Sequence, residues 1–309
     1  MYEIQLFGSV RVRAGGAALS GRDFGGVKPR QILALLALRG VLPKDELAEL
    51  LWLGRPPANH VATLESYVSV LRRRLDPQGS ARRSVILTRN GGYRLDSDRV
   101  SVDVTRFDAL LAAAAGRAPT QALPPLRAAL TLVKEPLLVD EPSADWAVDA
   151  RERYRKRIVD ALLGAAGHTL TVGDAPVALE FAARALRWDP LAERGWYLRV
   201  AAHRADGDRA AALRAYDECR RLLTRELGVE PSAELRHLFL ELLRQEVPAG
   251  CVDGVVAAIR AMARELASVG DLRAVGEGAG TSARRLVQLL TQATELADTP
   301  ARTSLSAVS

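Results

Sequence analysis

Residues 66–76 read SYVSVLRRRLD, and three consecutive arginines close a run whose apolar residues recur with helical spacing. The run begins upstream, and its apolar positions fall on one stripe of a helix at Val61, Leu64, Val68, Leu71 and Leu75. This spacing predicts a helix over residues 59–75 that buries the stripe. The other sides of the helix then face outward with their polar and basic side chains.

The sequence on either side of this helix predicts two more helices, an N-terminal strand segment and a hairpin. Residues 3–13, EIQLFGSVRVR, alternate apolar and polar side chains, which indicates a half-buried strand or a pair of strands. Helical periodicity returns over residues 29–39 and 44–52, and the breaker GRPPAN follows the second. Residues 81–96, ARRSVILTRNGGYRLD, have the pattern of a hairpin with its turn at 90–92. Strands, three helices and a hairpin are the outline of a winged helix-turn-helix.

The basic excess of the chain is confined to this first third. Of the 309 residues, 1–96 hold 15 Lys and Arg against 8 Asp and Glu, a net charge of +7. The remaining residues hold 28 against 29, a net charge of −1. Such a local excess is typical of a module that binds a polyanion. Together with the order of elements, it favours DNA as the partner of the third helix.

Four segments of this region together resemble those of a known family in their order and spacing. They are KPRQILALLAL, DELAELLW, ESYVSVLRRRL and ILTRNGGYRLD. Over residues 1–96 the chain is similar to the OmpR-type DNA-binding domain found in the Streptomyces antibiotic regulatory protein family. The resemblance implies that the helix over 59–75 is a recognition helix, which lies in the major groove of double-stranded promoter DNA. OmpR-type proteins often have a longer basic side chain where this chain has Ser69 and Val70.

The outward side of the predicted helix, the hairpin tip and a helix N-terminus, taken with the resemblance, predict which residues contact DNA. Base edges are assigned to Thr63, Ser66, Tyr67 and Val70, and phosphates to Arg72, Arg73 and Arg74. Arg89 and Asn90, near the hairpin tip, are assigned to the flanking minor groove or its phosphates. Lys28 and Arg30 flank a helix N-terminus, where an anion is also favoured. The alternatives are a solvated helix end for the three arginines, rim packing for Tyr67, and polar surface for Thr63 and Ser66.

Residues 97–247 begin with an acidic linking segment and then have the pattern of successive helices without further strands. Two segments, GDAPVALEFAARAL from Gly173 and GDRAAALRAYDECR from Gly207, align at an offset of 34 residues. A repeat of this length, with small residues at matching positions, is typical of tetratricopeptide helix pairs. We therefore expect a mainly α chain, in which an α+β winged helix-turn-helix precedes an all-α tetratricopeptide-like solenoid.

The helical region further resembles the bacterial transcriptional activation domain that follows the winged helix in the same family. Its most specific segment is ELGVEPSAELRHL, whereas LVKEPLLVDEPSADW lacks the Trp-Arg-Gly type of turn expected before its Pro-Leu. The resemblance implies self-association, at least on DNA, and contact with the sigma or alpha subunit of RNA polymerase.

Residues 248–309 lie beyond the resemblance. Apolar residues recur with helical spacing over 252–269 and 282–297, which predicts a helical hairpin appendage followed by a disordered tail. The hairpin either packs on the repeats or acts as a dimerising or partner-binding element. Cys219 and Cys251 lack the spacing of a disulfide framework or a zinc site, and we interpret both as buried or half-buried residues.

The sequence lacks the motifs of enzymes and of cofactor binding. No HExxH, GxSxG, GxGxxG or Walker-type loop occurs, and His60, His168, His203 and His237 have no i, i+4 pairing. We therefore expect no enzyme, no cofactor and no metal. The sequence also has no leader-like start and no run of 18 apolar residues, so we expect a cytoplasmic protein that does not enter a membrane.

These expectations combine into one predicted function, a sequence-specific transcriptional activator that binds promoter direct repeats and recruits RNA polymerase. The family resemblance implies that it governs a secondary-metabolite, or antibiotic, gene cluster. The rival hypothesis is a tetratricopeptide-type scaffold whose basic winged helix docks an acidic protein. Sequence-dependent binding to duplex DNA separates the two.

Overall fold

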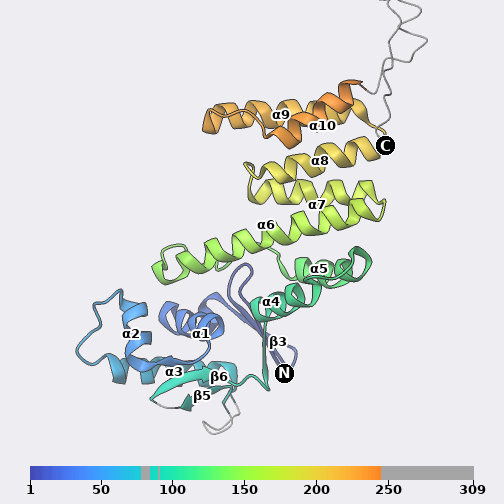
Figure 1. Ribbon diagram of the computed structural model, residues 1–309. Helices are drawn as coiled ribbons and strands as arrows, with labels where there is room; N and C mark the ends of the chain where they lie inside the picture. Colours follow the sequence, from blue (N-terminus) through green and yellow to red (C-terminus); the bar gives the residue numbers. More distant parts are fainter. Residues whose placement is uncertain (78–83, 90, 245–309) are drawn as a thin grey trace, which may run out of the picture. The chain divides into compact units, whose positions relative to one another are not determined.

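The computed structural model describes residues 1–77, 84–89 and 91–244 (Figure 1). Residues 1–242 form one compact unit, in which a small α+β part precedes a series of helices. The predicted fold class, mainly α with a winged helix-turn-helix at the start, is confirmed. The appendage and tail expected over 248–309, with Cys251, lie outside the described residues.

The N-terminal sheet consists of four short strands, β1 (Tyr2–Gln5), β2 (Arg11–Ala14), β3 (Ala17–Ser20) and β7 (Val100–Val102). Their order is β3-β2-β1-β7, and β1 pairs antiparallel with β2 and parallel with β7. The predicted alternation is confirmed, because Ile4 and Val12 are buried on the inner face of the sheet. Glu3, Arg11 and Arg13 are exposed on its outer face.

The strand β7 lies in the acidic linking segment, where the sequence predicted no strand, and that prediction is wrong. Val100 pairs with Tyr2 and Val102 pairs with Ile4. A strand of three residues is too short to show an alternation, and its partner lies at the far end of the first hundred residues. The segment that joins the two halves of the chain is therefore part of the N-terminal sheet.

Three helices pack beside this sheet after a short helical turn, and their bounds are η1 (Gly21–Phe24), α1 (Val27–Arg39), α2 (Lys44–Trp52) and α3 (His60–Leu75). All three predicted helices are confirmed. α3 packs against α1, α2 and η1, and its residues Leu64, Val68 and Leu71 are buried. Val61 was predicted to belong to this buried stripe, but it is 38% exposed, because it is turned about 50° from the centre of the stripe.

The predicted hairpin is confirmed as β5 (Ile86–Arg89) and β6 (Gly92–Leu95), and a third strand, β4 (Leu42–Pro43), pairs with β6. Because β4 joins α1 to α2, this pairing fixes the hairpin to the helical core. The approach of β4 leaves no room for a side chain at Gly92, where a Cβ would collide with the carbonyl group of Leu42.

The chain beyond β7 is helical, with α4 (Asp103–Ala114), α5 (Pro119–Leu132), η3 (Asp145–Ala147), α6 (Val148–Thr171), α7 (Ala175–Trp188), α8 (Glu193–Ala205), α9 (Arg209–Leu227) and α10 (Ala233–Arg244). Successive helices from α4 to α9 pack in the order of the sequence (Figure 1). Within the described ranges, no helix is both long and apolar enough to cross a membrane.

Residues that match at the offset of 34 take the same structural role in both predicted repeats. Asp174 caps α7, since its carboxylate accepts a hydrogen bond from the Val177 N–H at 3.2 Å, and Asp208 caps α9 through the Ala211 N–H at 2.8 Å. The helical-repeat pattern predicted for this region is confirmed in these helices.

Loss of either cap is expected to destabilise the repeats by a similar small amount. Replacing Asp174 with alanine should lower the free energy of unfolding by about 1 kcal/mol, because the N–H that it accepts from loses its partner. Asp208→Ala should do the same, whereas Asp174→Asn should retain most of the stability. Urea unfolding of the full chain measures all three, and a cap role is excluded if Asp174→Ala and Asp174→Asn unfold alike.

The last helices bury a second apolar cluster, which includes Trp196, Tyr216 and Cys219. Tyr216 stacks on Phe239 with ring centroids 4.1 Å apart, and the Trp196 indole N–H donates to the Pro190 carbonyl oxygen at 2.8 Å. Burial raises the pKa of the Cys219 thiol to about 12, so this thiol stays protonated at neutral pH. The prediction that Cys219 is a buried residue is confirmed.

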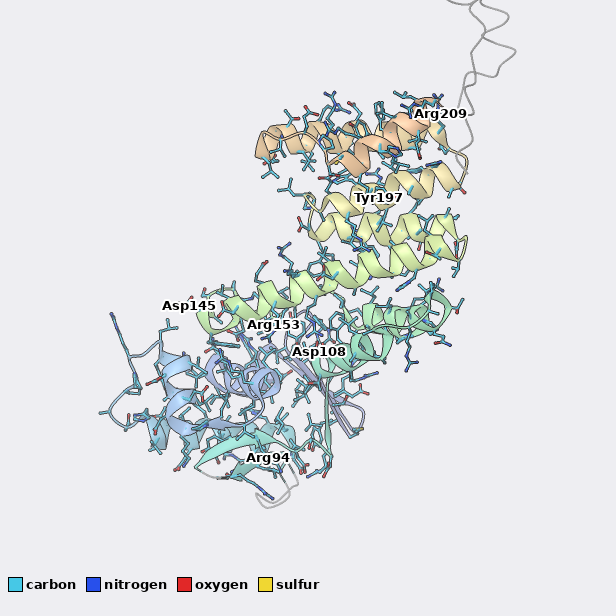
Figure 2. All side chains as sticks on the ribbon, in the orientation of Figure 1. Arg94, Asp108, Asp145, Arg153, Tyr197 and Arg209 are labelled. Carbon is cyan, nitrogen blue, oxygen red and sulfur yellow. The ribbon has the colours of Figure 1, made fainter. Side chains whose placement is uncertain are left out.

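The winged helix and the first repeat helices share one continuous apolar core. Phe7, Phe107 and Tyr154 meet edge to face, with centroid distances from 5.3 to 6.2 Å. The Tyr154 hydroxyl donates to Asp108 of α4 at 3.0 Å, and Figure 2 labels Asp108 and Arg153 at this junction. The acidic linking segment therefore connects two parts of the chain that pack directly against each other.

Asp103, the first residue of α4, ties this junction together. Its Oδ2 accepts hydrogen bonds from the N–H groups of Leu6 and Phe7 at 2.8 and 2.9 Å, and its Oδ1 accepts one from Val104 at 2.8 Å. Burial raises the pKa of the Asp103 carboxyl, and these hydrogen bonds oppose the shift. One buried carboxylate therefore accepts hydrogen bonds from the N–H groups of the two residues that follow β1 and of the second residue of α4.

Candidate nucleic-acid interface

The surface of α3 opposite its buried stripe is narrow and built mostly from small side chains. The residues that lie there are Ala62, Ser66, Ser69 and Arg73, and all four are exposed. We call this set the outer face of α3. Small side chains let a helix backbone come close to whatever it docks on, and the arginine adds a positive charge at one end. No element of the core against which α3 packs covers this set.

The structure distributes the four residues predicted for base contacts unevenly. Ser66 is exposed at the centre of the outer face, whereas Thr63, Tyr67 and Val70 are half-buried along one flank. Thr63 Oγ1 donates to the Asn59 carbonyl oxygen at 3.1 Å, and Tyr67 packs against the main core.

Val70 is held against the turn before α1. A Cβ at Gly25 would collide with Val70 Cγ1, and Gly25 has a φ of +87°, so glycine satisfies both constraints there. Val70 therefore contributes packing as well as any contact with a thymine methyl group. Two residues of the outer face, Ala62 and Ser69, were not assigned to DNA from the sequence, although the position opposite the Leu64–Leu71 stripe points to them.

The three consecutive arginines have two different roles in the structure. Arg73 and Arg74 are exposed, and within the described residues neither side chain has an ion-pair partner. Arg72 turns toward the hairpin, where it donates to the Ile86 carbonyl oxygen at 2.8 and 3.1 Å and to Thr88 Oγ1 at 2.8 Å. The assignment of Arg72 to phosphate is corrected, because its donors fasten β5 to α3.

Lys28 and Arg30 also require correction as phosphate contacts. The Lys28 ammonium donates to the Leu51 carbonyl oxygen and lies 5.9 Å from the centre of the Trp52 ring. Burial is the main cause that lowers the pKa of Lys28. Arg30 is bound by carboxylates from the loop before α6, so neither side chain is free at this helix N-terminus.

One residue of the hairpin stays a candidate for a contact with DNA. Arg89, the last residue of β5, is exposed, and its side chain has no ion-pair partner within the described residues. Asn90, which follows it, lies outside the described residues. The positive charge at this end of the hairpin therefore comes from Arg89.

Glu65 is a further residue of this surface, and no feature of the sequence marked it as functional. It is the one acidic residue in the α3 sequence, and its Oε1 lies 2.6 Å from Lys44 Nζ at the start of α2. The hydrogen bond to Glu65 is the main cause that raises the pKa of Lys44. This pair offsets the negative charge that Glu65 would otherwise bring beside the outer face.

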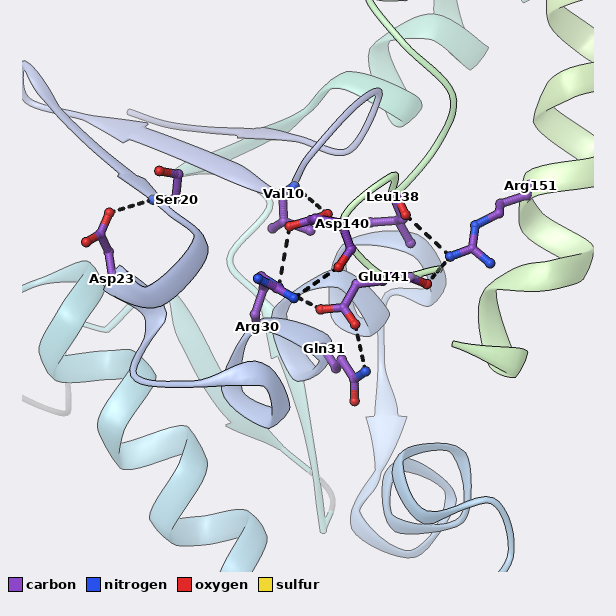
Figure 3. A network of polar contacts seen from close by, with 9 residues as sticks. All are labelled: Val10, Ser20, Asp23, Arg30, Gln31, Leu138, Asp140, Glu141 and Arg151. Atoms are coloured by element: carbon purple, nitrogen blue, oxygen red, sulfur yellow. Dashed lines mark hydrogen bonds and ion pairs between the residues drawn. The ribbon is translucent and has the colours of Figure 1, made fainter. Parts of the chain in front are cut away.

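The winged helix is joined to the repeats by a polar cluster, the interdomain latch, made by Arg30, Gln31, Asp140, Glu141 and Arg151 (Figure 3). Arg30 Nε lies 2.6 Å from Glu141 Oε1 and 3.5 Å from Asp140 Oδ2. Gln31 Nε2 donates to the second oxygen of Glu141 at 2.7 Å. Arg151 of α6 donates to the Glu141 carbonyl oxygen. The latch orients α1, and with it α3, relative to α6.

Two family models match this chain, one over the winged helix and one over the helical repeats. Residues 26–95 match the model described as transcriptional regulatory protein, C terminal, and residues 102–243 match the model described as bacterial transcriptional activator domain. Both matches stop short of residues 248–309.

Known proteins with both parts are also similar to this chain. The regulatory protein DnrI of Streptomyces peucetius is 33% identical, covering 71% of this chain and 85% of DnrI. The transcriptional regulator RedD of Streptomyces coelicolor is 29% identical, covering 79% of this chain and 71% of RedD. A solved structure of Mycobacterium tuberculosis EmbR, in complex with a low affinity phosphopeptide, superposes with a TM-score of 0.67 at 27% identity, covering 86% of this chain and 71% of that chain.

DnrI is a regulatory protein and RedD is a transcriptional regulator, and the family consists of transcriptional regulators. DnrI matches over most of both chains, and the two family models match this chain one after the other. The similarity therefore covers the winged helix and the helical repeats alike. The chain belongs to the Streptomyces antibiotic regulatory protein family of transcriptional regulators.

Proposed function

We propose that this chain activates transcription by binding promoter DNA through the outer face of α3, with the β5–β6 hairpin on the flanking groove. The observation that carries the proposal is the exposed face of Ala62, Ser66, Ser69 and Arg73, beside Arg74, which has no ion-pair partner among the described residues. A helix of this width fits the major groove of B-DNA. In Figure 1, α3, β5 and β6 lie at the end of residues 1–242 opposite to α7 to α10, so these described helices do not cover α3.

The chemistry of the outer face favours a division of roles. The hydroxyl groups of Ser66 and Ser69 donate to and accept from base edges, and the Ala62 methyl group suits the methyl group of thymine. Arg73 and Arg74 follow at the C-terminal end of α3, and Arg89 at the hairpin, where each can bind a phosphate. Thr63, Tyr67 and Val70, along the flank, are proposed to bind bases only at the edge of the contact.

We further propose that each winged helix binds one unit of a direct repeat, and that the helical repeats bind another copy of the chain and RNA polymerase through its sigma or alpha subunit. DnrI and RedD are regulatory proteins from Streptomyces species, which supports a secondary-metabolite gene cluster as the target. The latch supports the same proposal, since it gives each bound winged helix a defined orientation to its own repeats.

The role of the arginines is tested by replacing Arg73 and Arg74 together with alanine in the full chain. Binding should weaken by a similar factor for every duplex sequence, and the slope of log K against log salt should fall by about two, because each phosphate contact contributes about 0.9. Fluorescence anisotropy over a salt series measures both. A matched control replaces Arg220 and Arg221 of α9, an exposed pair that is bound by Asp217, and should leave the slope unchanged.

The double variant contradicts the proposed interface if it binds at full strength with an unchanged salt slope. Replacement of Ser66 or Ser69 should instead change the preferred sequence at one or two positions, which selection from a random duplex pool reveals. If the unaltered chain shows no sequence preference at all in that selection, the basic winged helix is better explained by an acidic protein partner.

A further inference from the structure

A second basic surface lies apart from α3, in a hollow between the outer face of the N-terminal sheet and the helices α4 and α5. The hollow has a volume of about 140 Å³, many times the space that one water molecule requires. Four cationic side chains line it, Arg11, Arg13, Arg106 and Lys134. We call it the cationic hollow, and none of its lining residues comes from α3 or from the β5–β6 hairpin.

The fold brings these four residues together from separate parts of the sequence. Arg11 and Arg13 lie two positions apart on β2, so both point to the outer face while Val12 between them is buried. Arg106 lies in the first turn of α4, which Asp103 anchors to β1, and Lys134 follows the end of α5. The hollow exists because the linking segment is folded against the sheet.

The four cations have no counterion in the described part of the chain. Neither a hydrogen bond nor an ion pair is formed by the side chains of Arg11, Arg13, Arg106 or Lys134 there. This contrasts with arginines of the repeats such as Arg155 and Arg204, which are paired with carboxylates at 2.8 and 2.6 Å. Like charges gathered around one hollow repel each other, so an anion in the hollow would be stabilised.

Two carboxylates also line the cationic hollow, but neither neutralises it. Asp103 directs its oxygens to the N–H groups of Leu6, Phe7 and Val104. Glu3 lies opposite Arg13 in the register of β1 and β2, yet the two side chains form no ion pair. The formal charge of the lining residues is therefore positive by two, which matches a group with two negative charges.

We propose that the cationic hollow binds the phosphate group of a small phosphorylated molecule. The forked guanidinium groups of arginine bind phosphate oxygens in pairs, and the lysine adds a point charge. A bound phosphate would bridge β2 to α4 and to the end of α5, and so would link the winged helix to the first repeat at a place separate from the interdomain latch. The DNA interface is not part of this site.

Inorganic phosphate is the probe that tests the site in the full chain. Titrated against sodium chloride of equal ionic strength, phosphate should raise the thermal unfolding midpoint in a saturable manner, as expected when a ligand binds the folded state alone. Arg106→Gln should weaken this binding by roughly tenfold, since one charge-assisted contact is lost. The matched control is Arg214→Gln on α9, another exposed and unpaired helical arginine of the described chain, which should bind phosphate normally.

Two further variants sharpen the result. Arg11→Gln removes a cation of the same hollow from β2, so it should weaken phosphate binding without any change in α4. Glu3→Gln should tighten phosphate binding, because it removes a carboxylate that repels the anion. The proposal is overturned if phosphate acts no differently from chloride, or if both arginine variants bind phosphate as the unaltered chain does. It is also wrong if Arg106→Gln lowers the affinity and the salt slope for a DNA duplex, because the hollow then holds a backbone phosphate.

Discussion

Replacing Glu141 with alanine is expected to lower the free energy of unfolding of the full chain by about 3 kcal/mol. The Glu141 side chain is only 4% exposed and that of Arg30 is 13% exposed, so the ion pair between them is largely withdrawn from water. Without Glu141, the Arg30 guanidinium keeps the more distant Asp140 carboxylate, and Gln31 loses its acceptor. Urea unfolding followed by circular dichroism measures the loss.

A double-mutant cycle distinguishes a lost ion pair from lost packing. Arg30→Met combined with Glu141→Leu removes both charges, and it should recover much of the stability that either single variant loses. The control is Glu152→Ala, which breaks an ion pair of 2.8 Å with Arg155 on the exposed surface of α6 and should leave the unfolding midpoint unchanged. Equal losses from Glu141→Ala and Glu152→Ala would show that burial of the latch has no energetic effect.

Replacing Asp103 with alanine is expected to cost about 3 kcal/mol of unfolding free energy, because the backbone N–H groups of Leu6, Phe7 and Val104 lose their acceptor. Each of these hydrogen bonds is buried. The variant should also loosen the pairing of β1 with β7, which hydrogen exchange of the β1 amides reports.

Asp103→Asn separates the role of the acceptor oxygen from that of the side-chain volume. One oxygen remains in the asparagine side chain, and it can still accept from Leu6 and Phe7, which share Oδ2 in the structure. This variant should therefore lose less than half as much stability as Asp103→Ala. If the asparagine and alanine variants were equally unstable, the hydrogen bonds to Leu6 and Phe7 would not explain the effect.

The sequence predicts well those features that repeat over a short distance. The stripe of α3, the hairpin and the offset of 34 residues all depend on periodicity within a few turns or strands, and all are found. The same periodicity also contained the outer face of α3. The position opposite the buried stripe is that of Ala62 and Ser69, whereas the sequence-based prediction placed the outward side on the flank with Thr63, Tyr67 and Val70.

The wrong predictions share a different cause: the residue or strand in question binds a partner that its own stretch of sequence does not contain. Arg30 is bound by residues 110 and 111 positions later, and Arg72 by the hairpin that follows it. A basic residue looks the same in a sequence whether it is free or paired, so a phosphate contact is assigned too readily. β7 is missed for the same reason, because its partner β1 opens the chain.

The junction through Phe7, Asp103 and Glu141 has a consequence for how such regulators diversify. A recombinant that joins the first 96 residues of one relative to the remainder of another would separate β1 from β7 and Arg30 from Glu141, and would inherit mismatched halves. If α3 binds DNA as proposed, new operator preferences are acquired more easily by point changes on its outer face than by exchange of whole modules. For engineered chimeras, the safe unit of exchange reaches at least to the start of α6.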